Sequence, residues 1–237
     1  MFEFGKKHPI GFEIILIIVA FIAAGIFTLA GSVLYLPSEL STSIGRIIVG
    51  IVLMLVYRRA FKENRSFTNG LVYTAPILLI VFWNVFYNLS SGLSFGGASF
   101  FVEGAITALA PAIFEEVLFR GIFIYNLKES GASDTKCLYV SALLFSLIHL
   151  TNIVGGDVAS TLLQVVYSFV IGLFLGAVYL KNRSLLQVIL CHFLIDFSNR
   201  IYDGTAGTAN TVQIVIFAIV LIALAVYSLF LFKKKEK

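Results

Sequence analysis

The sequence is poor in charged residues, which make up 13% of its 237 residues, whereas hydrophobic residues make up 59%. Soluble globular proteins carry about 25% charged and about 45–50% apolar residues. A mean hydropathy of +0.97 excludes a disordered chain, since such chains have too little apolar surface to form a core. Two cysteines, Cys137 and Cys191, are too few for a disulfide scaffold. The composition therefore predicts an all-α integral membrane protein.

Long polar connections are also scarce, because the longest runs only from about residue 58 to 70. A span needs roughly 20 apolar residues. Lys6 and Lys7 precede an apolar run longer than the roughly 7–15 residues of a signal peptide, so we expect a retained anchor. The sequence predicts a single integral membrane domain, 1–237, without a second soluble domain. Eight spans are predicted, near 10–36, 42–57, 71–90, 100–127, 136–151, 159–180, 184–200 and 211–232.

The basic residues favour one side of this eight-span arrangement. If alternate connections lie on opposite sides, 14 of the 17 basic residues fall on one side, Arg46 and Arg200 on the other, and Arg120 within a span. Positive residues gather on the cytoplasmic side of membrane proteins. We therefore expect both termini in the cytoplasm and interpret the net charge of +4 as a sign of topology, with no nucleic-acid partner. The 14 residues are Lys6, Lys7, Arg58, Arg59, Lys62, Arg65, Lys128, Lys136, Lys181, Arg183, Lys233, Lys234, Lys235 and Lys237.

Ionisable residues inside the predicted spans are the strongest indication of function, because each costs about 2.5–3.5 kcal/mol or more at the centre of a membrane helix. They lie in three separate spans. The rise of about 1.5 Å per residue places Glu115 about 18 Å, His149 about 20 Å and Asp196 about 18 Å from the ends expected in the cytoplasm. We expect these groups to lie in one slab of the membrane. The full set is Glu115, Glu116, Arg120, His149, His192 and Asp196.

Positions on the helix separate the roles of the two glutamates. Glu116 and Arg120 are four residues apart and share a helix face, which predicts an ion pair. Glu115 is turned about 100° away and is free to face another span. A buried carboxylate within reach of a water molecule is suited to act as a general base. We therefore expect Glu115, with His149 and His192 nearby, to activate water for the hydrolysis of an amide.

Other interpretations of the same residues remain open. The Glu115, Glu116 and Arg120 cluster is also typical of a structural ion pair that fixes helix packing. The two histidines would also serve as interhelical hydrogen-bonding groups. Glu115 and the histidines are compatible with a catalytic zinc ion, although no zincin spacing is present, so the prediction is no cofactor with zinc as the alternative.

Several further polar residues within the spans receive structural interpretations. We expect Asn84, Gln164 and Gln187 to hydrogen-bond across helices. Three charged residues lie near span ends, where their side chains are expected to reach water. These are Glu13, Arg46 and Glu103.

Three ordered motifs carry a family resemblance. Glu-Glu-x-x-x-Arg at 115–120, Phe-x-x-x-His at 145–149 and His-x-x-x-Asp at 192–196 resemble those of the CPBP family, the CAAX protease and bacteriocin-processing group. This group includes the type II CAAX prenyl endopeptidases and the Abi proteins. The resemblance covers roughly residues 100–200, which we interpret as the catalytic core. It implies an eight-span, glutamate-dependent intramembrane endopeptidase.

The resemblance also implies a role for each matching residue. By analogy Glu115 and His149 activate the water, His192 and the residue at 196 stabilise the oxyanion, and Glu116 with Arg120 supports the site. The prenyl endopeptidases carry asparagine at the last position, whereas this chain has Asp196. An ionised carboxylate cannot donate a hydrogen bond to the oxyanion. The alternatives are that Asp196 is protonated, that Asp196 orients His192, or that Asn199 is the donor.

The leading hypothesis is a multi-pass protease of the cell membrane that cleaves a peptide or a membrane-associated protein. A bacteriocin-immunity or regulatory protein that binds a partner in the same cavity without catalysis is the alternative. A transporter is a third class, supported only by charges near the midplane of the membrane. The substrate, its lipidation and the oligomeric state are not predicted by any of these patterns.

Overall fold

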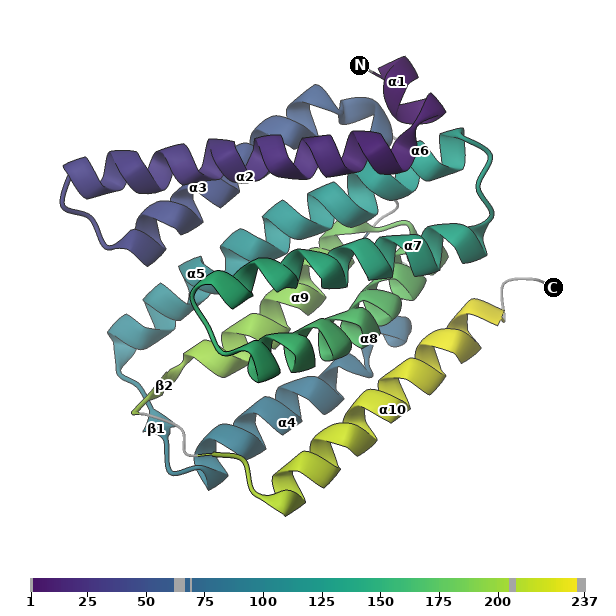
Figure 1. The fold of residues 1–237 in the computed structure, drawn as a ribbon. Helices are drawn as coiled ribbons and strands as arrows, with labels where there is room; N and C mark the ends of the chain where they lie inside the picture. The colour runs from purple at the N-terminus through teal and green to yellow at the C-terminus, as the bar shows by residue number, and fades with distance from the viewer. Residues whose placement is uncertain (1, 62–66, 69, 205–207, 234–237) are drawn as a thin grey trace.

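The structure is a computed structural model that describes residues 2–61, 67–68, 70–204 and 208–233, and these residues are almost entirely helical (Figure 1). Short helices η1 (Arg58–Phe61), η2 (Leu71–Thr74) and η4 (Ile148–Val154) are of the 3₁₀ type, whereas η3 (Val117–Phe123) is a π-helix. The strands are β1 (Ser94–Phe95) and β2 (Tyr202–Asp203). The α-helices are α1 (Phe2–Lys7), α2 (Pro9–Val33), α3 (Ser38–Val56), α4 (Ile77–Ser90), α5 (Ala98–Glu116), α6 (Ile124–Glu129), α7 (Asp134–Leu147), α8 (Val158–Asn182), α9 (Leu185–Arg200) and α10 (Thr211–Lys233).

Within the described residues, six helical segments are long and apolar enough to cross a membrane, which confirms the predicted polytopic all-α class. The other two predicted spans coincide with the continuous run from α5 to α6 and with α9. Helix α9 has only 16 residues, and α5 carries three glutamates, so neither resembles a lipid-facing span. The count of eight and the cytoplasmic termini stay predictions. The six segments are Pro9–Val33, Ser38–Val56, Leu71–Ser90, Asp134–Val154, Val158–Asn182 and Thr211–Phe232.

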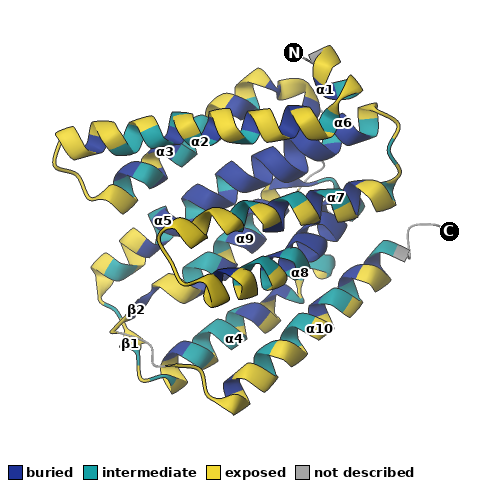
Figure 2. Ribbon diagram, viewed as in Figure 1, coloured by how far each residue is buried: buried dark blue, intermediate teal, exposed yellow. Residues whose placement is uncertain are grey.

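Helices α5 and α9 form the centre of the bundle. Figure 1 shows the antiparallel pair α2 and α3 on one side of them and α4 with α10 on the other. Figure 2 shows that the C-terminal halves of α5 and α8 are mostly buried, whereas α2 and α10 present exposed outer faces. Those outer faces are apolar, with Ile22 62% and Ile222 64% exposed, as expected for surfaces in contact with lipid.

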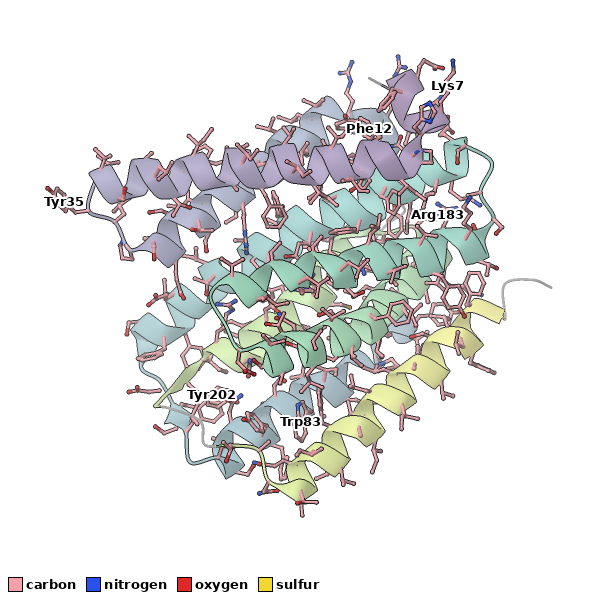
Figure 3. The ribbon with its side chains drawn as sticks, viewed as in Figure 1. Lys7, Phe12, Tyr35, Trp83, Arg183 and Tyr202 are labelled. Atoms are coloured by element: carbon pink, nitrogen blue, oxygen red, sulfur yellow. The ribbon has the colours of Figure 1, made fainter. Side chains whose placement is uncertain are left out.

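The two ends of the bundle differ in their residues. Figure 3 shows Lys7 and Arg183 at one end and Tyr35 and Tyr202 at the other. An ion pair of 2.7 Å between Lys6 and Glu129 joins α1 to α6 at the first end. At the opposite end, β1 and β2 pair antiparallel and tie the loop before α5 to the loop after α9. The predicted cytoplasmic residues Lys62, Arg65, Lys234, Lys235 and Lys237 lie outside the described residues.

The prediction that Glu13 reaches water was wrong. Its side chain is fully buried, and neither carboxylate oxygen has a hydrogen-bond partner. The physical reason is tertiary, because the short helices α1 and α6 pack over the start of α2 (Figure 1). Glu103, in contrast, is exposed as predicted.

Candidate active site

The acidic pair lies where one helix type changes into another. Helix α5 ends at Glu116, and the π-helix η3 follows directly and contains Arg120. π-Helical turns are rare and are frequent at functional sites. Glu115 is 6% exposed, and Glu116 and Arg120 are fully buried. The chain therefore places three ionisable side chains within six residues at the centre of the bundle.

Glu116 joins two helices through one oxygen atom. Arg120 Nη1 donates to Glu116 Oε1 over 2.8 Å, which is the ion pair expected from the spacing. His192 Nδ1 lies 2.8 Å from the same oxygen. Arg120 also donates from Nη2 to the carbonyl oxygen of Gly172 on α8 over 3.2 Å. The contact with His192 was not anticipated, because it depends on how α9 packs against α5.

Phe145 supports this ion pair and both histidines. The Arg120 guanidinium carbon lies 4.3 Å from the centre of the Phe145 ring, a distance typical of a cation–π contact. His149 and His192 meet the same ring edge-on, at centroid distances of 5.5 and 5.9 Å. One aromatic side chain thus contacts the arginine and both histidines.

The other nitrogen of His192 faces two carboxylates. His192 Nε2 is 4.0 Å from Glu115 Oε2 and 3.9 Å from Asp196 Oδ2. Both distances exceed a direct hydrogen bond, and such gaps suit a bridging water molecule. Asp196 is partly exposed, with a quarter of its side chain accessible. The spacing therefore allows a water molecule to contact a carboxylate and an imidazole at once.

His149 lies on the 3₁₀ helix η4 rather than on an α-helix, because α7 ends at Leu147. Its Nδ1 is 3.4 Å from Gln164 Nε2, and Gln164 Oε1 accepts from Asn152 over 2.9 Å. In this orientation of the Gln164 amide its nitrogen donates, so Nδ1 accepts and the hydrogen of a neutral imidazole lies on Nε2. His149 can therefore donate toward a water molecule or a substrate oxygen.

A cavity of about 810 Å³ contains most of these groups. Glu115, His149, His192 and Asp196 line it, whereas Glu116 and Arg120 are not among its lining residues and lie behind the wall. The cavity also has an aromatic wall, since Trp83 stacks on Phe217 at 5.2 Å and Tyr167 meets the Phe217 ring edge-on at 5.8 Å (Trp83 is labelled in Figure 3). Its volume is in the range of ligand-binding sites, about 300–1,000 Å³.

Further polar residues line this cavity. Arg46 on α3, interpreted from the sequence as a span-end residue, lies in the cavity wall with its guanidinium carbon 5.8 Å from the Phe21 ring centre. The predicted interhelical bonds of Asn84 and Gln187 are confirmed by contacts to Ser198 and Asn182. The sequence could not reveal which helix Arg46 faces.

The zinc alternative has no ready ligand set among the described residues. No group of three or more histidine, cysteine, aspartate or glutamate side chains in these residues is arranged to hold a metal ion.

These features define a class, a polytopic helical membrane protein with a cavity that is lined by carboxylates and histidines. Within this class, residues 97–198 match the family model described as "Type II CAAX prenyl endopeptidase Rce1-like". The match confirms the predicted resemblance and coincides with the expected core at 100–200. The family is one of proteases, which supports protease activity, and the chain is a multi-pass membrane protein. Comparisons with curated proteins and with solved structures found no match.

Proposed function

We propose that this protein is a glutamate-dependent intramembrane endopeptidase of the cell membrane, which hydrolyses a peptide bond in a membrane-associated protein or peptide. The observation that supports this most is the facing pair of Glu115 and His192 in the wall of the cavity, 4.0 Å apart and both nearly buried. The family match over residues 97–198 supports the same conclusion.

In the proposed reaction Glu115 accepts a proton from a water molecule as the water oxygen attacks the scissile carbonyl carbon. His149, whose Nε2 carries hydrogen, orients this water by donating to its oxygen. His192 donates from Nδ1 to Glu116 and, when doubly protonated, from Nε2 to the oxyanion that forms. Glu115 then transfers the proton to the leaving nitrogen as the C–N bond breaks, which regenerates the carboxylate.

Glu116 and Arg120 act as positioning residues in this scheme. They do not line the cavity, but Glu116 Oε1 contacts His192 Nδ1 over 2.8 Å and Arg120 holds Glu116 in place. A fixed acceptor at Nδ1 keeps Nε2 directed toward the substrate, a common way to orient a catalytic imidazole.

The test compares Glu115→Gln with Glu103→Gln, a matched control because Glu103 lies on the same helix and is exposed. Cleavage is measured as new protein termini in membranes, and as hydrolysis of quenched fluorescent CAAX peptides with and without a prenyl group. Loss of a general base lowers the rate by about 10²–10⁴. We expect this loss for Glu115→Gln and none for Glu103→Gln.

Two results would redirect the proposal. If Glu115→Gln cleaves at the wild-type rate, the glutamate-activated mechanism is wrong. If Glu115→Gln also rescues the phenotype of a deletion strain without any change in termini, a non-catalytic binding role replaces the protease. We also expect a metal chelator to leave the rate unchanged. If the chelator abolishes activity and added zinc restores it, the reaction belongs to the zinc alternative.

A further inference from the structure

A chain of asparagine amides joins α4 to α9 beside the cavity. Asn84 Nδ2 donates to the carbonyl oxygen of Ile195 and to Ser198 Oγ, each over 2.9 Å. One turn later, Asn88 Nδ2 donates to the carbonyl oxygen of Asn84 and to Asn199 Oδ1, each over 2.8 Å. Asn88 is 4% exposed, whereas Asn199, which accepts one of its two bonds, is exposed.

The backbone sets the direction of every bond in this chain. A main-chain carbonyl only accepts, so the Asn88 atom next to Asn84 O must be the amide nitrogen. The same nitrogen meets Asn199, so the Asn199 atom that it meets must be the oxygen. The nitrogen of Asn199 therefore points away from Asn88, and among the described residues it has no hydrogen-bond partner.

Asn199 lies in the cavity wall with His192 and Asp196, on the same helix α9. Seven residues separate Asn199 from His192, which is a rise of about 10 Å along the helix. Asp196 lies between them and approaches His192 Nε2 to 3.9 Å. Asn199 thus lies about two helical turns beyond His192, on the far side of Asp196.

We propose that Asn199 is a substrate-binding residue, whose amide nitrogen donates to a main-chain carbonyl of the substrate two or three residues from the scissile bond, and that Asn88 positions it. An extended chain advances about 3.3 Å per residue, so such a carbonyl lies about 7–10 Å from the scissile one. This inference rests on the proposed peptidase function.

The side chain next to Asn199 in the cavity wall does not replace this donor. Asp196, which lies between His192 and Asn199 on α9, cannot donate when it is ionised, and Arg200 is the other donor of α9 in the cavity wall. A substrate in an extended conformation presents unpaired carbonyl oxygens, and each one that leaves water without meeting a donor is costly. Asn199 supplies a donor whose orientation is determined before the substrate arrives, which lowers the entropic cost of binding.

The test separates donation by Asn199 from its role as an acceptor. Asn199→Asp keeps the oxygen that accepts from Asn88 but removes the donor, whereas Asn199→Leu removes both without adding charge. Asn88→Leu leaves Asn199 able to donate but frees it to rotate. Asn210→Asp is the control, because only the side-chain oxygen of Asn210 is used, in a bond from Gln213 N over 3.0 Å, and Asn210 does not line the cavity.

The readouts are the rate at which new membrane-protein termini appear after induction, which requires no known substrate, and the melting temperature of each purified variant. We expect roughly five- to tenfold slower cleavage for both Asn199 variants, a smaller loss for Asn88→Leu and none for Asn210→Asp. We also expect Asn199→Asp to melt at the wild-type temperature, because its bond with Asn88 remains.

Each other outcome overturns the proposal. Wild-type cleavage by Asn199→Asp would show that Asn199 serves only as an acceptor that fastens α9 to α4. Slower cleavage with an equally lowered melting temperature in both variants would show a purely structural role. If wild type and Glu115→Gln produce the same termini, the proposed peptidase function fails, and the role proposed for Asn199 fails with it. If Asn199→Asp behaves as wild type while Glu115→Gln does not, only the role of Asn199 fails and the peptidase function stands.

Discussion

Replacing Arg120 with methionine removes the buried positive charge at the centre of the bundle while keeping a long apolar side chain. Arg120 is fully buried, donates to Glu116 and to Gly172 O, and lies 4.3 Å from the Phe145 ring centre. Removal of one partner from a buried ion pair costs about 3–5 kcal/mol, because the other charge is left without compensation. We expect a destabilisation of this size.

The two cysteines provide the assay. Cys137 and Cys191 are free and buried, so a thiol-reactive fluorophore labels them when the protein unfolds. A melting temperature falls by about 2–4 °C per kcal/mol in a chain of this size, so Arg120→Met is expected to melt about 6–20 °C below wild type.

The double variant Glu116→Gln with Arg120→Met tests the reason for this loss. It removes both charges of this ion pair together, and the glutamine oxygen still accepts from His192 Nδ1. We expect it to melt above Arg120→Met alone. A single variant that melts with wild type, or a double variant whose loss equals the sum of the two single losses, would refute the coupling of these charges.

Two further predictions concern helix packing and capping. A Cβ atom at Gly172 would lie 3.2 Å from Phe145 Cδ1, so Gly172→Val should lower both the melting temperature and the rate of cleavage. Gly25→Val should have a smaller effect, because no atom lies within 4 Å of the new Cβ. Asp157 caps α8 by accepting from Ser160 N over 2.8 Å, and this bond holds the pKa of the Asp157 carboxyl below its ordinary value. The stabilisation by ionised Asp157 is present above its unfolded-state pKa and is lost as pH falls through the lowered folded-state pKa. From neutral to acid pH, the melting temperature should therefore fall further for wild type than for Asp157→Asn. Parallel declines would contradict this prediction.

Much of the fold was predictable because membrane helices are defined by local hydropathy. All eight predicted ranges coincide with helices, including α9, whose 16 residues and polar motif make it a weak span by composition. The ionisable residues were also predictable as a group, since burial in a membrane is costly enough to make each one informative. The spacing of Glu116 and Arg120 was sufficient to predict their ion pair, because both lie on one helix.

What depended on the tertiary structure was which faces of the helices meet. The bond from His192 to Glu116, the place of Arg46 in the cavity wall, the burial of Glu13 and the orientation of Asn199 all arise between helices. In water a helix reveals its inner face by the contrast between apolar and polar residues. In a membrane the lipid is as apolar as the protein core, so this contrast is missing and only packing decides which residues are brought together.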